Sequence, residues 1–188
     1  MRRVLVLGLT IAIALQVAVS LAADQVGSPS DQLKKSLQTW QARKAQCGGN
    51  YSYTVGFQSW AGFGNSTVIV VRNNKVVERK YSEFNRNAPP MPQQPGKEPP
   101  KAEGQNWTEK GKEIGTHKQG APAKTLDTFY AEAKAILEVK LEPTQKLSIA
   151  FDKQGLLQHC FWMDTRIADD APRNGVIIGQ LQLEPADK

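Results

Sequence analysis

Two segments carry the clearest structural signal in this 188-residue chain: YSYTVGF at residues 51–57 and TVIVVRNNKVVERKYSEF at residues 67–84. In the first, aromatic and apolar side chains alternate with Ser, Thr and Gly, which is typical of a strand with one buried face. The second is rich in β-branched residues on both sides of Asn73-Asn74, and asparagine tolerates the positive φ angles of a tight hairpin turn. With WAGFGNS at 60–66 as a further turn, this region predicts three successive antiparallel strands.

An amphipathic helix is expected immediately before these strands. Its apolar face recurs at spacing i, i+4, i+7, through Leu33, Leu37 and Trp40. We expect the helix to begin at Ser30 or Asp31, which are good N-cap residues, and to end near Cys47, because two glycines follow.

The second half of the chain repeats this order. Thr125 is an N-cap candidate, and the helix that it starts is expected to end before Pro143. Three strand-like segments follow, KLSIAF at 146–151, LLQHCFWMD at 156–164 and GVIIGQLQL at 175–183. Short connections favour antiparallel pairing. The sequence therefore predicts an α+β fold, in which two helices pack on one face of a mostly antiparallel sheet of about six strands.

Between the two halves lies a long segment of different composition, residues 85–124. Seven of the eleven prolines fall here, among Gly, Gln, Lys and Glu, and such a mixture does not build a core. We expect an extended Pro-rich loop within a single domain that covers residues 23–188. A functional alternative is a proline-rich ligand, because Pro92 and Pro95 form a PxxP motif.

The N-terminus has the pattern of a cleaved signal peptide over residues 1–22. Arg2 and Arg3 precede an apolar run, and small residues Ser20 and Ala22 occupy the −3 and −1 positions of a cut before Ala23. The alternative is a membrane anchor. We expect a secreted or periplasmic protein with no membrane span after cleavage.

The charge of the chain argues against one class of partner. Cleavage of the leader removes Arg2 and Arg3 and lowers the formal net charge from +6 to +4. The remaining Lys and Arg residues are dispersed along the sequence. A nucleic-acid-binding surface requires clustered basic residues with interleaved aromatics. We therefore expect no nucleic-acid partner.

Two cysteines, Cys47 and Cys160, are a candidate disulfide, because paired thiols of exported proteins are usually oxidised. The alternative is two buried thiols that lie too far apart to be bridged. The sequence alone leaves both options open.

The acidic stretch DTRIADDAP, at residues 164–172, is the most suggestive candidate for chemistry. Asp164, Asp169 and Asp170, together with a neighbour such as Asp152, are candidate Ca²⁺ ligands, although the spacing does not match an EF-hand loop. An acid–base pair, or a dyad of His159 with an aspartate, is a further option. The favoured interpretation is an Asx-type turn between the last two strands. The chain has no HExxH, CxxC, GxSxG or P-loop motif.

Several of these features together resemble an uncharacterised exported bacterial family, domain of unknown function 6174. They are a turn from Asp152 to Gly155, an apolar strand that reaches Asp164, and the pair Asp169-Asp170. Further matches are Trp40, the Tyr51 and Tyr53 strand opening, VIVVRNNKVV at 68–77 and TLDTFYAEA at 125–133. The resemblance covers most of residues 36–183. It implies export and an α+β fold, and no reaction.

We expect a non-enzymatic exported domain that binds a protein or a cell-envelope component. It would use an exposed sheet face or the long loop, with Trp60, Phe63 and Trp107 as candidate anchors. Core packing of these aromatic residues is the competing interpretation. The alternative function is a small secreted hydrolase, or a metal- or ligand-binding protein, built around the acidic residues 164–170 and His159. No cofactor other than Ca²⁺ is indicated.

Overall fold

The computed structural model describes residues 27–85, 106–167 and 171–186. The expected signal peptide, the PxxP motif and the pair Asp169-Asp170 lie outside the described residues.

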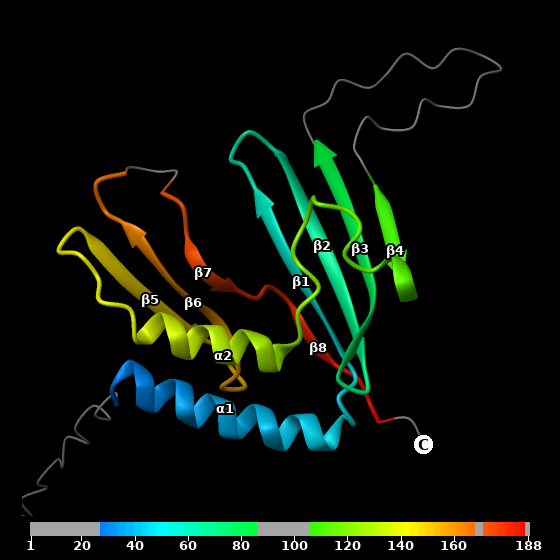
Figure 1. Ribbon diagram of the computed structural model, residues 1–188, viewed down its shortest axis with the longest axis horizontal. Helices are drawn as coiled ribbons and strands as arrows, with labels where there is room; N and C mark the ends of the chain where they lie inside the picture. The colour runs from blue at the N-terminus through cyan, green and yellow to red at the C-terminus, as the bar shows by residue number, and fades with distance from the viewer. Residues whose placement is uncertain (1–26, 86–105, 168–170, 187–188) are drawn as a thin grey trace, which may run out of the picture.

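Two α-helices, one short 3₁₀ helix and eight strands make up the described chain (Figure 1). In chain order they are α1 Pro29–Gln46, β1 Tyr51–Gln58, β2 Phe63–Arg72, β3 Lys75–Asn85, β4 Trp107–Lys110, η1 Gly111–Glu113, α2 Leu126–Leu137, β5 Gln145–Phe151, β6 Leu157–Asp164, β7 Asn174–Ile177 and β8 Leu181–Leu183.

The strands form two antiparallel sheets, with orders β4-β3-β2-β1-β8 and β5-β6-β7. The predicted α+β class is confirmed, but the structure has eight strands in two sheets in place of about six strands in one. One of the added strands, β4, lies inside the segment 85–124 that was expected to be a loop. The other arises because the predicted last strand, 175–183, is divided into β7 and β8.

The division of the last strand joins the two sheets. The amide of Ile178 donates to the carbonyl of Gln158 on β6, at 2.8 Å. The next amide, Gly179, donates to Thr54 on β1 at 2.7 Å, and Thr54 in turn donates to the carbonyl of Gln180 at 3.0 Å. The chain therefore passes from the edge of one sheet to the edge of the other without losing its backbone hydrogen bonds.

Both helices begin at side-chain caps. The helix α1 begins at Pro29 and not at Ser30 or Asp31 as predicted, because the Ser28 hydroxyl accepts the Asp31 amide at 3.2 Å and proline suits the first helical position. It ends at Gln46, as the glycines predicted. For α2 the predicted cap is confirmed, since the Thr125 side chain accepts the amide of Thr128.

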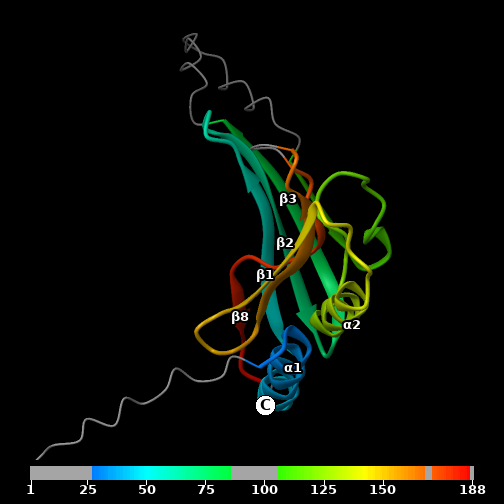
Figure 2. The ribbon, with the colours of Figure 1, turned by 90° about the vertical axis from the view of Figure 1, so that its left-hand side faces the viewer.

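The main core lies between the two adjacent helices and both sheets (Figures 1 and 2). The strands β1 and β2 contribute Tyr51, Tyr53, Ile69 and Val71, and the strands β6 and β7 contribute Leu157, Cys160 and Val176. The Trp40 ring of α1 meets Tyr51 edge-on, with ring centroids 5.1 Å apart. The Tyr51 hydroxyl accepts the amide of Leu126 at 2.9 Å, and the Tyr53 hydroxyl donates to the carbonyl of Lys124 at 2.6 Å. Buried tyrosines thus fix the start of α2 on the sheet.

The two cysteines are free thiols, so the disulfide option is wrong. Cys47 caps the end of α1, where its Sγ lies 3.5 Å from the carbonyl oxygen of Lys44. Cys160 lies in β6 beneath α2, with its Sγ 3.7 Å from the carbonyl oxygen of Ala133. Each sulfur is buried in a different part of the core. Burial raises the pKa of the Cys160 thiol to about 11, which keeps it protonated and unreactive near neutral pH.

No helix within residues 27–85, 106–167 and 171–186 is long and apolar enough to cross a membrane.

Gly179 is required at the junction of the two sheets, because a Cβ there would collide with the carbonyl oxygen of Thr54. We predict that Gly179→Val lowers the free energy of unfolding by about 1–3 kcal/mol. Denaturant unfolding followed by circular dichroism measures this. Gln180→Ala is the control, because it removes an exposed side chain and keeps the backbone hydrogen bonds. Equal stability of the wild type and Gly179→Val would contradict the role of the junction.

The free thiols give a second prediction. Under non-reducing conditions, a thiol-reactive dye is expected to label neither Cys47 nor Cys160 in the folded protein, because both are buried. Two thiols per chain are expected to react after unfolding in denaturant. A chain that gains reactive thiols only after reduction would contradict the two separate burial sites.

Candidate functional site

The largest exposed aromatic feature of the described chain is the tip of the β1–β2 hairpin. We define the aromatic tip as Phe57, Trp60 and Phe63. Their side chains are 55%, 100% and 48% exposed, and the two phenylalanine rings lie 6.4 Å apart. In both views the hairpin extends beyond the two helices toward one end of the molecule (Figures 1 and 2). Trp60 and Phe63 were predicted from the sequence as anchor candidates. Phe57 was missed, because the apolar alternation of residues 51–57 predicted that its side chain lies on the buried face of the strand.

The backbone of the aromatic tip is largely bonded within its own turn. The amide of Ser59 donates to the carbonyl of Phe63 at 2.8 Å, and the amide of Gly62 donates to the carbonyl of Ser59 at 3.1 Å. The amide of Ala61 donates to the Ser59 hydroxyl at 3.2 Å. Three amides of the turn that carries the aromatic rings therefore already have acceptors.

Trp107, the third anchor candidate, takes part in packing instead. Its ring is stacked between Tyr81, at a centroid distance of 5.3 Å, and His117, at 4.4 Å. The guanidinium of Arg79 lies 4.6 Å from the centroid of the same ring. The structure thus separates Trp107 from the aromatic tip.

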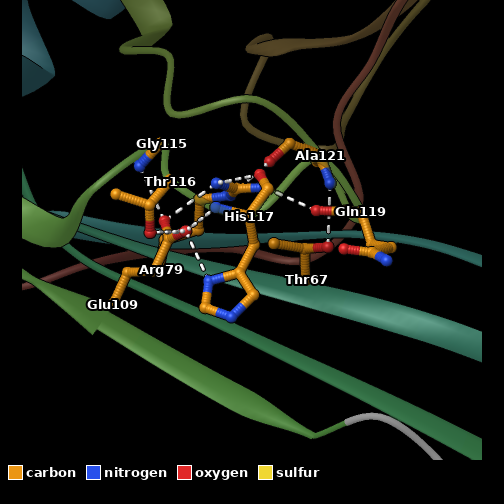
Figure 3. Close-up of polar contacts among 8 residues, drawn as sticks. All are labelled: Thr67, Arg79, Glu109, Gly115, Thr116, His117, Gln119 and Ala121. Carbon is orange, nitrogen blue, oxygen red and sulfur yellow. Dashed lines mark hydrogen bonds and ion pairs between the residues drawn. The ribbon is translucent and has the colours of Figure 1, made fainter.

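A buried ion pair lies beside Trp107. Arg79 of β3 and Glu109 of β4 are cross-strand partners, and their side chains are only 3% and 1% exposed. The guanidinium nitrogen of Arg79 lies 2.8 Å from the Glu109 carboxylate. The remaining Arg79 donors bind the backbone carbonyls of His117, Gln119 and Ala121 (Figure 3). Arg79 therefore fastens the segment that leads into α2 onto the sheet.

Both carboxylate oxygens of Glu109 also have hydrogen-bond partners. Its carboxylate accepts the amides of Gly115 and His117, the Thr116 hydroxyl and a ring contact from His117 Nδ1 at 2.9 Å (Figure 3). Burial alone would raise the pKa of Glu109. The backbone and ring hydrogen bonds and the charge of Arg79 outweigh burial and lower this pKa to about 2. The carboxylate is therefore ionised throughout the physiological range.

The Glu109–His117 pair has the form of the orienting half of a catalytic triad, in which a carboxylate holds the Nδ1 side of an imidazole. The His117 side chain is about half exposed, but its ring is stacked flat on Trp107, with an interplanar angle of 8°. The hydrogen bonds of Arg79 and Glu109 all hold the loop that carries His117. A structural role for the Glu109–His117 pair therefore accounts for these contacts.

The acidic stretch is divided in the structure. Asp164 accepts hydrogen bonds from the guanidinium and the backbone amide of its near neighbour Arg166, and these lower the pKa of Asp164 to about 2. Asp152 accepts the amides of Gln154 and Leu156 in the turn between β5 and β6. Both carboxylates thus close local turns, as the favoured interpretation expected. Within the described ranges, no three His, Cys, Asp or Glu residues converge as metal ligands.

His159 pairs with a serine and not with an aspartate. Its Nε2 lies 2.9 Å from the hydroxyl of Ser148 on the adjacent strand β5. Burial and the nearby charge of Arg173 lower the pKa of His159, so the neutral imidazole is favoured. The Phe161 ring lies 5.0 Å from the imidazole and also receives the Arg173 guanidinium at 5.4 Å. This small cluster was not predicted, because Ser148 and His159 lie 11 residues apart and meet only through the pairing of β5 with β6.

Comparison of the chain with family models, with curated proteins and with solved structures gives no match. The resemblance to the uncharacterised exported family therefore stays a prediction.

The ion pair gives a prediction with a defined pH dependence. The pKa of Glu109 falls from its ordinary value of 4.5 to about 2 on folding. The ionised carboxylate therefore contributes to the free energy of unfolding above pH 4.5, and this contribution is lost as the pH falls toward 2. Glu109→Gln leaves Arg79 buried without a counter-charge, and we expect it to lower the free energy of unfolding at pH 7 by about 3 kcal/mol. The difference from the wild type should shrink as the pH falls below 4.5.

Urea unfolding between pH 7 and pH 3 measures this difference. Glu78→Gln is the control, because Glu78 pairs with the well-exposed Lys110, and an exposed pair contributes only about 0.5 kcal/mol. A loss of stability in Glu109→Gln that stays the same at every pH would contradict the ionised, buried pair.

Proposed function

We propose that this chain is an exported, non-enzymatic docking domain that attaches to a cell-envelope component through the aromatic tip. The single observation that carries this proposal is the full exposure of Trp60 between two half-exposed phenylalanines. A tryptophan that is wholly exposed to water contributes no packing to the fold. Aromatic side chains of this kind dominate the binding energy of interfaces.

The distribution of the other aromatic residues supports the same role. Trp40, Tyr51 and Tyr53 are buried in the core, and Trp107 is stacked between two rings. These side chains have packing partners within the domain. The aromatic tip therefore differs from the rest of the aromatic set by its lack of a role in the core.

Export is supported by the signal-peptide pattern of residues 1–22 and by the resemblance to an exported family. We place the domain in the periplasm or outside the cell. Its two thiols are buried there, which limits their access to oxidants.

A small secreted hydrolase is the second candidate, and the contact between Ser148 and His159 favours it. A serine hydroxyl within hydrogen-bond reach of a neutral imidazole is the core of a nucleophile–base pair. The acids Asp164 and Asp152 are engaged in turns, so they do not support this reading. Covalent labelling of Ser148 by a serine-directed phosphonate, lost in His159→Ala, tests it.

Docking through the aromatic tip predicts a separation of binding from stability. Trp60→Ser is expected to leave the melting temperature unchanged, because the side chain is 100% exposed, and to reduce retention on an isolated envelope fraction by about tenfold. Co-sedimentation of the purified protein with that fraction measures retention. Val77→Ser is the matched control, because Val77 is another exposed apolar residue, near the β2–β3 turn. Equal retention of Trp60→Ser and the wild type would contradict the proposal.

A further inference from the structure

We propose that the envelope component bound by the aromatic tip is the lipid bilayer itself, and that Phe57, Trp60 and Phe63 insert into its interfacial region. This inference rests on the proposed function and names its ligand. A protein partner is the competing occupant, and the properties of the tip favour lipid.

The first property is the absence of charge on the hairpin. The sequence from Phe57 to Val71 contains no Asp, Glu, Lys or Arg, in a chain that is 22% charged. The nearest acid on the adjacent strand is Glu83, opposite Asn65, and its carboxylate accepts the Tyr81 hydroxyl at 2.8 Å. A charged group is costly to move toward hydrocarbon, so an uncharged tip lowers the cost of insertion. Specific protein interfaces usually add charged groups that fix orientation.

The second property is the bonded backbone of the turn. Within a bilayer, an unbonded backbone donor costs several kcal/mol. The amides of Ser59, Ala61 and Gly62 already donate within the turn. These three amides therefore lose no bond to water when the turn enters a low-dielectric region.

The third property is the chemistry and shape of the apex. Tryptophan is enriched where a bilayer meets water, because its ring is apolar and its indole N–H still finds a partner there. The β1–β2 turn lies at the end of the sheet beside the end of β3, and Trp60 at this turn is fully exposed (Figure 2). A protein would need a pocket that matches the Trp60 side chain, whereas a fluid interface adapts to its shape.

A second apolar point lies at the same end of the molecule. The strands β1 and β6 run in the same direction, because each is antiparallel to the continuous run through β7 and β8. Ile167 follows the end of β6 by three residues and is 48% exposed. Its neighbour Arg166 is also exposed. Insertion of the aromatic tip would bring Arg166 and Ile167 toward the headgroups and define one orientation of the domain on the surface.

Protein-free vesicles of phosphatidylcholine test the inference. The chain from residue 23 is used, because every described helix and strand lies beyond that point and the apolar leader would bind lipid by itself. We expect the wild type to co-sediment with these vesicles even in about 1 M NaCl, where the Debye length is about 3 Å. Trp60→Ser is expected to weaken the partition coefficient by about tenfold, and Val77→Ser to leave it unchanged.

The outcomes separate the two proposals. If the wild type does not bind vesicles, but Trp60→Ser still reduces retention on the envelope fraction, the lipid inference is overturned and docking to a protein or glycan stands. Equal binding of the wild type and Trp60→Ser to vesicles also overturns the inference, since another surface would then be responsible. If neither vesicles nor the envelope fraction retain the wild type, both proposals fail.

Discussion

The fold depends most heavily on the buried ion pair between Arg79 and Glu109. This pair attaches the short edge strand β4 to β3, and it fastens the segment from Gly115 to Ala121 onto the sheet. That segment leads directly into α2, whose first turn is then held by the tyrosines of β1. A buried charge is strongly destabilising without its partner, so the network favours one position of the loop over all others. The same network stacks His117 over Trp107 and closes the face of the sheet on that side.

The functional proposal concerns the aromatic side chains that this packing does not bury. The core uses the large aromatic side chains at the base of the β1–β2 hairpin, and the region of the ion pair uses those of β3 and β4. The aromatic tip, at the far end of the same strands, lies beyond the reach of both helices (Figure 1). A rigid sheet that carries unburied aromatic rings at one end is suited to attachment, because few degrees of freedom are lost when the rings are buried by a ligand. One end of the β1–β2 hairpin therefore packs in the core, and the other end carries the proposed docking residues.

Much of this architecture could be predicted from local signals. Asn73-Asn74 adopt the positive φ angles of a hairpin turn, and Thr125 caps α2, because each choice depends only on nearby backbone. The strand β4 was missed, since WTEK is too short to show a strand pattern of its own and its pairing with β3 brings Glu109 to Arg79 from a distant part of the sequence. Arg79 shares its alternation with Tyr81, which was an available signal that this arginine is buried. The division of the last strand depends on tertiary contacts of Gly179 that no local pattern records. For the site, Trp60 and Phe63 were identified by residue type, and their exposure required the structure.

The most direct test of the account is the fluorescence of Trp60 on binding to an envelope surface. The chain has four tryptophans, and Trp60 is fully exposed whereas Trp40 is fully buried. The difference between the spectra of the wild type and Trp60→Phe isolates the contribution of Trp60. The account predicts that this contribution shifts to shorter wavelength when phosphatidylcholine vesicles are added, because the indole leaves water. An unchanged Trp60 spectrum in protein that is demonstrably bound to the vesicles would contradict it.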